Sequence, residues 1–244
     1  MKKKKSGSGS SLIFVLVGPL ADEKTLARFA HDEFRSSAAV AFIGVDGGLK
    51  ALLASGLPIT LAIGDFDSAP SIQRLVKGTG ISLIHLAREK ERSDLSFALE
   101  FAADQNATVI YALGFQGGRA DHDFAVHLDL VAASQRVPRV VSVGEKGVVF
   151  YLSARHSPLR IESKNIESLR VAMAPKNRHS RDVVKWASVF PIGGRATGVR
   201  LHGLRFKAAG GILSVSSQGL SNEVRAREIE VGVRQGRVAL FFPA

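Results

Sequence analysis

The sequence predicts an α/β protein in two parts, a three-layer α/β/α domain with a mainly parallel sheet over residues 11–143 and an all-β sandwich or barrel over residues 144–244. The first part alternates short β-branched runs with helix-periodic stretches, which is typical of a parallel sheet covered by helices on both faces. The second part has short apolar runs separated by Gly, Asn, Ser and Pro, which is typical of antiparallel β domains. Residues 1–10, rich in Lys, Gly and Ser, are expected to be a disordered or tag-like tail.

The apolar runs of the first part predict buried strands because their hydrophobic character is nearly continuous. These strands are expected over residues 12–17, 40–44, 60–63, 81–86, 108–113 and 139–143. Helices are expected between them, one capped by Asp22, one over 48–55, one over 69–77, one capped by Ser93 and one over 122–134. In the last of these, Phe124, Leu128 and Val131 are expected to point inward.

The second part shows no long helical pattern, so each of its apolar runs is predicted to be a strand. These runs cover residues 148–152, 159–162, 169–174, 183–190, 198–201, 211–215, 225–231 and 237–241. No internal repeat links the two parts of the chain.

Composition limits the classes of protein that this chain can belong to. The 244 residues are 45% hydrophobic, which is enough for a real core in one or two domains. The absence of cysteine excludes disulfides and thiolate metal sites, and we expect a cytoplasmic location. The apolar run 12–17 is short for a signal peptide, and no run approaches the ~20 residues of a membrane span.

The formal charge of +11 is unevenly distributed along the chain. Residues 155–244 carry a net charge of +10, and residues 1–154 carry +1. Such a basic half could attract nucleic acid or a polyphosphate substrate, or it could be a solvated surface. Its arginines stand singly among apolar residues, which disfavours nucleic acid.

The stretch Gly64-Asp65-Phe66-Asp67-Ser68 follows a predicted strand directly. In extended chain the side chains of Asp65 and Asp67 lie on the same side, so that their oxygens can share one cation. Oxygen ligands of this kind suit Mg²⁺, whose coordination is completed by water and substrate phosphates. An acidic turn is the structural alternative.

Three further polar groups follow the carboxyl ends of other predicted strands. They are Asp46-Gly47-Gly48, then Glu91, Ser93 and Asp94, and then Gly117-Gly118-Arg119-Ala120-Asp121-His122. In open α/β sheets, ligands bind at this edge, so the recurrence of polar groups there favours a site over scattered surface acids.

These residue types suit phosphoryl-type transfer from a nucleotide, in which metal ions neutralise phosphate charge. The backbone at Gly117-Gly118 can approach phosphate, Arg119 can clamp it, and the helix opened by Ser93-Asp94 favours an anion. Neither the P-loop pattern nor the dinucleotide-binding glycine pattern is present in the sequence.

Taken together, these motifs resemble those of thiamine pyrophosphokinase. The resemblance continues in the second part, with Ser188-Val189-Phe190-Pro191, Gly203-Leu204-Arg205-Phe206 and Gly219-Leu220-Ser221-Asn222-Glu223. It covers essentially everything after the tail, and the order and spacing of the motifs make it specific.

The resemblance implies transfer of a diphosphoryl group from ATP to the hydroxyl of thiamine, giving thiamine diphosphate and AMP. It implies Mg²⁺, with Asp65, Asp67, Asp94 and Asp46 as metal ligands, and a homodimer with the thiamine site near the subunit interface. The catalytic set it implies is Asp65, Asp67, Asp94 and Asp121, with either Asp94 or Asp121 as the proton acceptor. The nucleotide-binding set is Asp46, Gly47, Ser68, Ser93, Gly118, Arg119 and His122.

The thiamine side of the site is expected to comprise Phe206, Ser221, Asn222 and Trp186. The cationic thiazolium and flat pyrimidine of thiamine favour aromatic faces, which Phe206 or Trp186 could supply; ordinary β-core packing is the alternative. The chain departs from the family pattern at Glu91, Lys50 and Phe206, where the family commonly has Asp, Asn and Tyr or Trp.

Two other functions are compatible with the sequence. One is a pyrophosphokinase that acts on a hydroxymethyl pterin on the same scaffold. The other is a non-catalytic protein that binds nucleotides or nucleic acid through its basic half.

Overall fold

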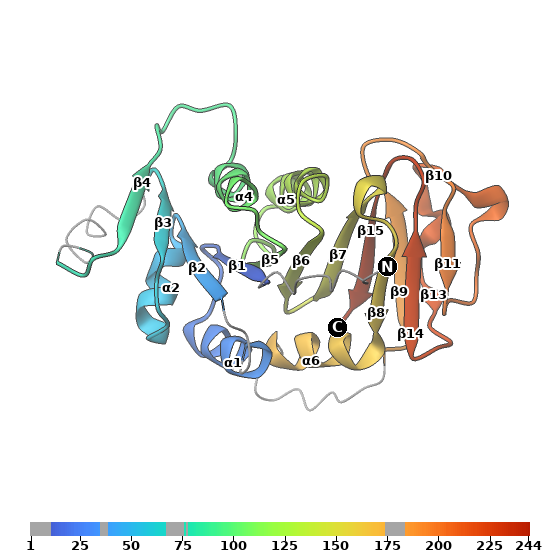
Figure 1. The fold of residues 1–244 in the computed structure, drawn as a ribbon, viewed down its shortest axis with the longest axis horizontal. Coiled ribbons are helices and arrows are strands. Elements are labelled where there is room, and N and C mark those ends of the chain that lie inside the picture. The colour runs from blue at the N-terminus through green and yellow to red at the C-terminus, as the bar shows by residue number, and fades with distance from the viewer. Residues whose placement is uncertain (1–10, 35–38, 67–75, 77, 174–183) are drawn as a thin grey trace, which may run out of the picture.

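A continuous ten-stranded sheet runs through the whole protein in the computed structural model (Figure 1), which describes residues 11–34, 39–66, 76, 78–173 and 184–244. The strand order is β13-β9-β15-β7-β6-β5-β1-β2-β3-β4. The first six strands in the chain pair in parallel. They are β1 (Leu12–Val17), β2 (Ala39–Val45), β3 (Leu61–Gly64), β4 (Ser82–His85), β5 (Val109–Leu113) and β6 (Arg139–Gly144).

The β-rich C-terminal part continues the same sheet in the antiparallel sense. It adds β7 (Gly147–Ser153), β15 (Arg237–Pro243), β9 (Trp186–Pro191) and β13 (Asn222–Glu223). Two smaller sheets accompany these strands. One holds β8 (Leu159–Glu162), β14 (Glu228–Gly232) and β11 (Arg200–His202), and the other holds β10 (Ala196–Thr197) and β12 (Ile212–Leu213). The expected α/β fold with a β-rich second part is therefore confirmed, and the sheet crosses the predicted boundary at residues 143–144 without a break.

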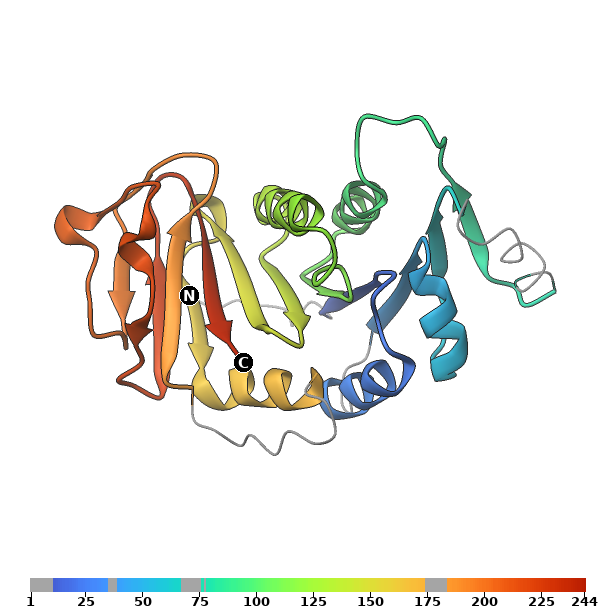
Figure 2. The ribbon, with the colours of Figure 1, turned by 180° about the vertical axis from the view of Figure 1, so that it is seen from behind.

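Helices cover both faces of the sheet (Figures 1 and 2). The helices α4 (Asp94–Asp104) and α5 (Ala120–Ala133) lie side by side on one face, and α1 (Glu23–Glu33) and α6 (Ser163–Met173) lie on the other. The helix α2 (Gly48–Ser55) has the predicted bounds. Both predicted caps are present, since Asp22 accepts a hydrogen bond from the Thr25 N–H and Ser93 from the Ser96 N–H.

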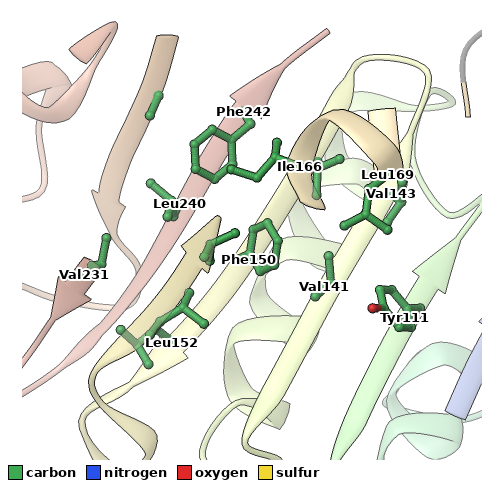
Figure 3. Close-up of a cluster of buried hydrophobic side chains, with 14 of the residues drawn as sticks. Tyr111, Val141, Val143, Phe150, Leu152, Ile166, Leu169, Val231, Leu240 and Phe242 are labelled. Carbon is green, nitrogen blue, oxygen red and sulfur yellow. The ribbon is translucent and has the colours of Figure 1, made fainter. Parts of the chain in front are cut away.

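The helix α6 contradicts the prediction of a strand over residues 169–174, and with it the all-β character of the second part. Ile166, Leu169 and Ala172 recur at a spacing of three and are all buried. Figure 3 shows Ile166 and Leu169 in the same apolar cluster as Phe150 and Phe242. The apolar run after residue 168 was interpreted as a strand, although it is the second half of an amphipathic helix. The buried face of that helix begins at Ile166 and packs against α1.

Two predictions about burial are also wrong. Among the described strands, β4 is the last of the sheet, and all four of its residues are exposed. On α5, Val131 is buried as expected, but Phe124 is 62% exposed and Leu128 is 40% exposed. The inward face of α5 is formed instead by Val126, Leu130 and Val131. The predicted helix over 69–77 lies outside the described residues, apart from Val76.

Two apolar clusters hold the layers together, one on each face of the sheet. One packs the sheet against α1 and α6 and extends through β8 and β14 into the β-rich part, and the other packs it against α4 and α5. None of the helices in the described part of the chain is both long and apolar enough to cross a membrane.

The packing of α6 predicts a contrast between two substitutions on the same helix. Ile166→Ala leaves a cavity beneath a fully buried side chain and is expected to lower the free energy of unfolding by about 2–5 kcal/mol. Val171→Ala, at a position 43% exposed, is expected to change it by less than about 0.5 kcal/mol. Chemical denaturation of both variants measures the difference, and equal costs would contradict the assignment of the buried face.

Candidate active site

The carboxyl ends of the parallel strands meet at one edge of the sheet. Val17 at the end of β1 pairs with Gly44 in β2 and with Leu113 at the end of β5. Gly64 at the end of β3 pairs with His85 at the end of β4. The loops that carry Asp46, Asp65 and Gly117 therefore leave the sheet on the same side, as predicted.

Two of the predicted acids share one positive charge at this edge. The ammonium of Lys90 lies 2.9 Å from Asp65 Oδ2 and 3.2 Å from Asp94 Oδ1. It also donates a hydrogen bond to the carbonyl oxygen of Ala87 at 3.1 Å. All three of these side chains are largely buried, since Lys90 is 13%, Asp65 15% and Asp94 21% exposed.

Asp46 lies close enough to this pair to act on it electrostatically. Burial raises the pKa of Asp94, and the negative charges of Asp65 and Asp46 add to this, against the lowering effect of Lys90. The backbone of Asp46 is left-handed (φ 47°), a conformation that Asp tolerates better than most residues, and its N–H donates to the carbonyl of Ile63. The Oδ1 atom of Asp46 is buried and has no hydrogen-bond partner within the described part of the protein.

This arrangement fits a divalent cation with oxygen ligands. Asp65 and Asp94 already surround a positive charge, and the buried Oδ1 of Asp46 needs a partner. Three or more His, Cys, Asp or Glu side chains in metal-binding arrangement do not occur among the described residues. Asp67 and Ser68, predicted as a metal ligand and a nucleotide-binding residue, lie outside those residues.

Two residues that were predicted to bind the nucleotide, Ser93 and Gly47, lie at the starts of helices. Ser93 caps α4, and its hydroxyl also donates to Asp129 Oδ2 on α5 at 2.6 Å, which ties the two helices together at the site. Gly47 precedes α2, where the backbone runs so close to β1 that a Cβ at Gly48 would lie 1.9 Å from the carbonyl oxygen of Val17. Gly48 thus lets the helix begin against the neighbouring strand.

The segment Gly117 to His122 lies at the same edge but does not join the acid cluster. Arg119 and Asp121 form an exposed ion pair at 2.6 Å, and this pairing lowers the pKa of Asp121. His122 and Gly118 are both exposed. The N–H of Gly117, at a φ of +112° that requires glycine, donates to both carboxylate oxygens of Asp123. Of the four described aspartates predicted for the site, three gather and Asp121 lies apart.

A cavity of about 690 Å³ opens beside this segment, where the two parts of the protein meet. Its walls come from the loops after β1, β5 and β6 and from the ends of β9 and β15. Apolar and polar side chains alternate in its lining, which includes Phe115, Gln116, Asp123, His127, Ser188, Phe190, Ser221 and Phe241. A mixed lining of this kind suits an organic molecule held by a few polar contacts.

A buried hydrogen-bonded chain leads from this cavity into the core, and the sequence analysis missed it. Gln116 Nε2 lies 2.9 Å from His127 Nε2, and His127 Nδ1 lies 2.7 Å from the Tyr151 hydroxyl, which lies 3.1 Å from Ser142 Oγ. With Gln116 as the first donor, His127 donates to Tyr151 and Tyr151 to Ser142. The four residues come from the loop after β5, the helix α5 and the strands β6 and β7, so no local motif signals this chain.

The residues predicted for the thiamine side lie on the β-rich part. Ser221 lines the cavity, and its N–H donates to Ser188 Oγ at 3.0 Å. Asn222 is buried, and its amide accepts from the N–H of Phe206 and donates to the carbonyl of Phe206, both at 2.8 Å. Its side chain therefore positions Phe206. Phe206 is 58% exposed and Trp186 is 51% exposed, so neither ring is part of the core of this chain.

Comparison with known proteins adds to this geometry. The family described as "Thiamin pyrophosphokinase, catalytic domain" matches residues 35–141, the stretch that holds the whole acid cluster. Residues 35–141 of this chain therefore belong to the thiamine pyrophosphokinase family. A thiamine pyrophosphokinase of Bacillus subtilis (strain 168) is 38% identical over 82 residues, which make up 33% of this chain and 38% of that protein. The aligned stretch thus spans well under half of the length of that relative.

Solved structures share the fold over nearly the whole chain. A thiamin pyrophosphokinase from Geobacillus thermodenitrificans has a TM-score of 0.72 at 21% identity, over 96% of this chain and 98% of its own. The B. subtilis thiamine pyrophosphokinase has a TM-score of 0.70 at 20% identity, over 96% and 99%. The Candida albicans enzyme has 0.67 at 13% identity, over 98% and 95%. At these identities the likeness shows a common fold, including the β-rich part outside the family match.

The buried chain predicts a pH dependence of stability. Burial lowers the pKa of His127, against a smaller raising effect of Asp123, so the folded state binds fewer protons than the unfolded state below the ordinary histidine pKa of about 6.5. The free energy of unfolding is therefore expected to fall as the pH drops below about 6.5.

The variant His127→Gln removes this titration and is expected to lose less stability between pH 7.5 and pH 5 than the unaltered protein. Urea denaturation at a series of pH values measures it. His31→Gln, at an exposed position, is the control and should leave the pH profile close to that of the unaltered protein. A His127→Gln profile parallel to the unaltered one would contradict the prediction.

Proposed function

We propose that this chain transfers the diphosphoryl group of ATP to the hydroxyl oxygen of thiamine, giving thiamine diphosphate and AMP. The observation that carries this proposal is the meeting of Asp65 and Asp94 on one positive charge at the carboxyl edge of a parallel sheet, with Asp46 within electrostatic reach of Asp94. Family membership supports the choice of substrates.

Asp65, Asp94 and Asp46 would hold Mg²⁺, with Asp67 as a further predicted ligand. When bound, Mg²⁺ supplies positive charge that offsets the charge of the ATP phosphates. The free N–H groups at the start of α4 favour an anion there. The backbone at Gly118 remains a predicted phosphate contact, whereas the N–H of Gly117 is already bonded to Asp123. Arg119 is exposed, so it can leave Asp121 to clamp a phosphate.

The two candidate proton acceptors differ in their surroundings. Asp121 is paired with Arg119, which lowers its pKa and makes it a weak base. We therefore favour a role for Asp121 in orienting Arg119. Asp94 remains as the carboxylate that could accept the proton of the attacking alcohol.

The cavity of about 690 Å³ is the candidate site for an organic ring of the substrates. Ser221, predicted for the thiamine side, is in its lining, together with Gln116 and the rings of Phe115 and Phe190. Phe206 and Trp186 are more than half exposed within one chain. Their exposure supports the expected homodimer, in which a second copy would cover them next to bound thiamine.

The direct test incubates the protein with ATP, Mg²⁺ and thiamine and measures AMP and thiamine diphosphate by chromatography. We expect the two products in equal amounts, and none without Mg²⁺ or without thiamine. A hydroxymethyl pterin serves as the competing acceptor. AMP formed with the pterin alone would favour the other pyrophosphokinase, and no AMP with either acceptor would favour a binding protein.

The acid cluster predicts a large loss of activity for Asp65→Asn. Removing this charge is expected to lower kcat/KM for AMP formation by about 100-fold or more. Asp65 is one of the carboxylates that would hold Mg²⁺, and the positive charge held there stabilises the transition state. The matched control is Asp104→Asn, at an exposed aspartate at the far end of α4 that pairs with Arg136. Asp104→Asn should retain the activity of the unaltered protein, and an equal activity of both variants would refute the assignment.

A further inference from the structure

We propose that Lys90 is an internal counter-cation of the acid cluster, which holds Asp65 and Asp94 together in the metal-free protein and competes with a divalent ion for them. The proposal rests on the metal site of the proposed function and concerns a residue for which the sequence predicted no role. It assigns to Lys90 control over how tightly the site binds its metal.

The first argument is geometric. An ammonium group has three N–H donors, and three oxygens surround that of Lys90. They are Asp65 Oδ2 at 2.9 Å, the carbonyl oxygen of Ala87 at 3.1 Å and Asp94 Oδ1 at 3.2 Å. The group is thus bound as a small cation is bound, by oxygens from the loop after β3, the loop after β4 and the first turn of α4.

The second argument is burial. With 13% of Lys90, 15% of Asp65 and 21% of Asp94 exposed, water screens these charges only in part. The contact of the ammonium with both carboxylates favours its charged form in this setting.

The third argument is the charge that the cluster must balance. Among the described residues, Asp46, Asp65 and Asp94 carry three negative charges when ionised, and Asp46 and Asp65 lie within electrostatic reach of Asp94. With Lys90, these four side chains carry a net charge of −2, which attracts a divalent cation. Without Lys90, three carboxylates would face one another in the metal-free protein, at a cost that grows as the local dielectric constant falls.

A divalent ion that takes oxygens of Asp65 and Asp94 must displace the ammonium or share these carboxylates with it. Both alternatives weaken the affinity for the ion, because two positive charges then lie a few ångströms apart. Removing the charge of Lys90 therefore has two opposite effects. It destabilises the metal-free protein, and it strengthens metal binding.

The first experiment compares Lys90→Met with the unaltered protein, using Mn²⁺ alone as the probe. We expect Lys90→Met to bind Mn²⁺ at least about tenfold more tightly in calorimetric or spin-resonance titrations, since one neighbouring positive charge is gone. Its thermal midpoint in EDTA should be lower than that of the unaltered protein, and saturating Mn²⁺ should remove the deficit. The matched control is Lys164→Met, an exposed lysine paired with Glu162, which should change neither quantity.

Equal or weaker Mn²⁺ binding by Lys90→Met would overturn the proposal, whatever the thermal midpoints. If Lys90→Met does not fold, the unaltered protein still provides a test. Acylation of Lys90 by a succinimidyl ester, followed by peptide mass spectrometry, reports the release of the ammonium, with Lys164 as the internal reference. We expect saturating Mg²⁺ to accelerate Lys90 labelling several-fold relative to Lys164, and an unchanged ratio would overturn the proposal.

These outcomes are separate from the fate of the proposed function. Tighter Mn²⁺ binding by Lys90→Met in a protein that forms no AMP from ATP and thiamine would support the counter-cation and refute the reaction. Normal AMP formation by the unaltered protein, together with an unchanged Mn²⁺ affinity of Lys90→Met, would support the reaction and refute the counter-cation.

Discussion

The parallel pairing of β1 to β6 is the constraint on which the candidate site depends. Because all six strands run in the same direction, every following loop leaves the sheet at the same edge. Neighbouring strands lie about 4.8 Å apart, so residues just past β2 and β3 are brought within electrostatic reach of each other. The start of α4 then adds Asp94 to Asp46 and Asp65. Acids that are distant in sequence thus become neighbours through hydrogen bonds between backbones.

The same constraint creates an electrostatic cost that the protein offsets locally. Three carboxylates in partly buried positions repel one another, and a lysine within the cluster supplies the opposite charge. The free N–H groups at the start of α4 act in the same direction on Asp94. Left-handed backbone at Asp46 and Phe66 accompanies this crowding, since the chain must turn sharply immediately after β2 and β3. A cluster whose negative charge is partly balanced from within can stay folded without metal and still attract a cation.

The continuous sheet explains why the cavity lies between the two parts of the protein. The hairpin of β6 and β7 carries the sheet from its parallel to its antiparallel half, and β15 and β9 follow. The cavity is therefore lined by Gln116 and His127 from the first part of the chain and by Ser188 and Ser221 from the second. The buried chain from His127 to Tyr151 crosses the same junction and couples the helix α5 to β7. The division of the chain at residues 143–144 remains a prediction, since one sheet serves both parts.

The sequence alone determined the strand–helix alternation, the caps at Asp22 and Ser93 and the polar residues at the ends of strands, because these follow from local periodicity and from side chains that act within a few residues. Tertiary structure decided what depends on packing between distant segments. Packing against α1 stabilises residues 163–173 as a helix, whereas Phe124 on α5 and the strand β4 remain exposed. The side-chain amide of Asn222 accepts from the N–H of Phe206 and donates to its carbonyl oxygen, which fixes the backbone of Phe206. Tertiary structure also placed Lys90 between two aspartates and aligned Gln116 with His127 and Tyr151. A sequence pattern shows which residues can be charged or buried, but only the folded chain decides which charge lies beside which.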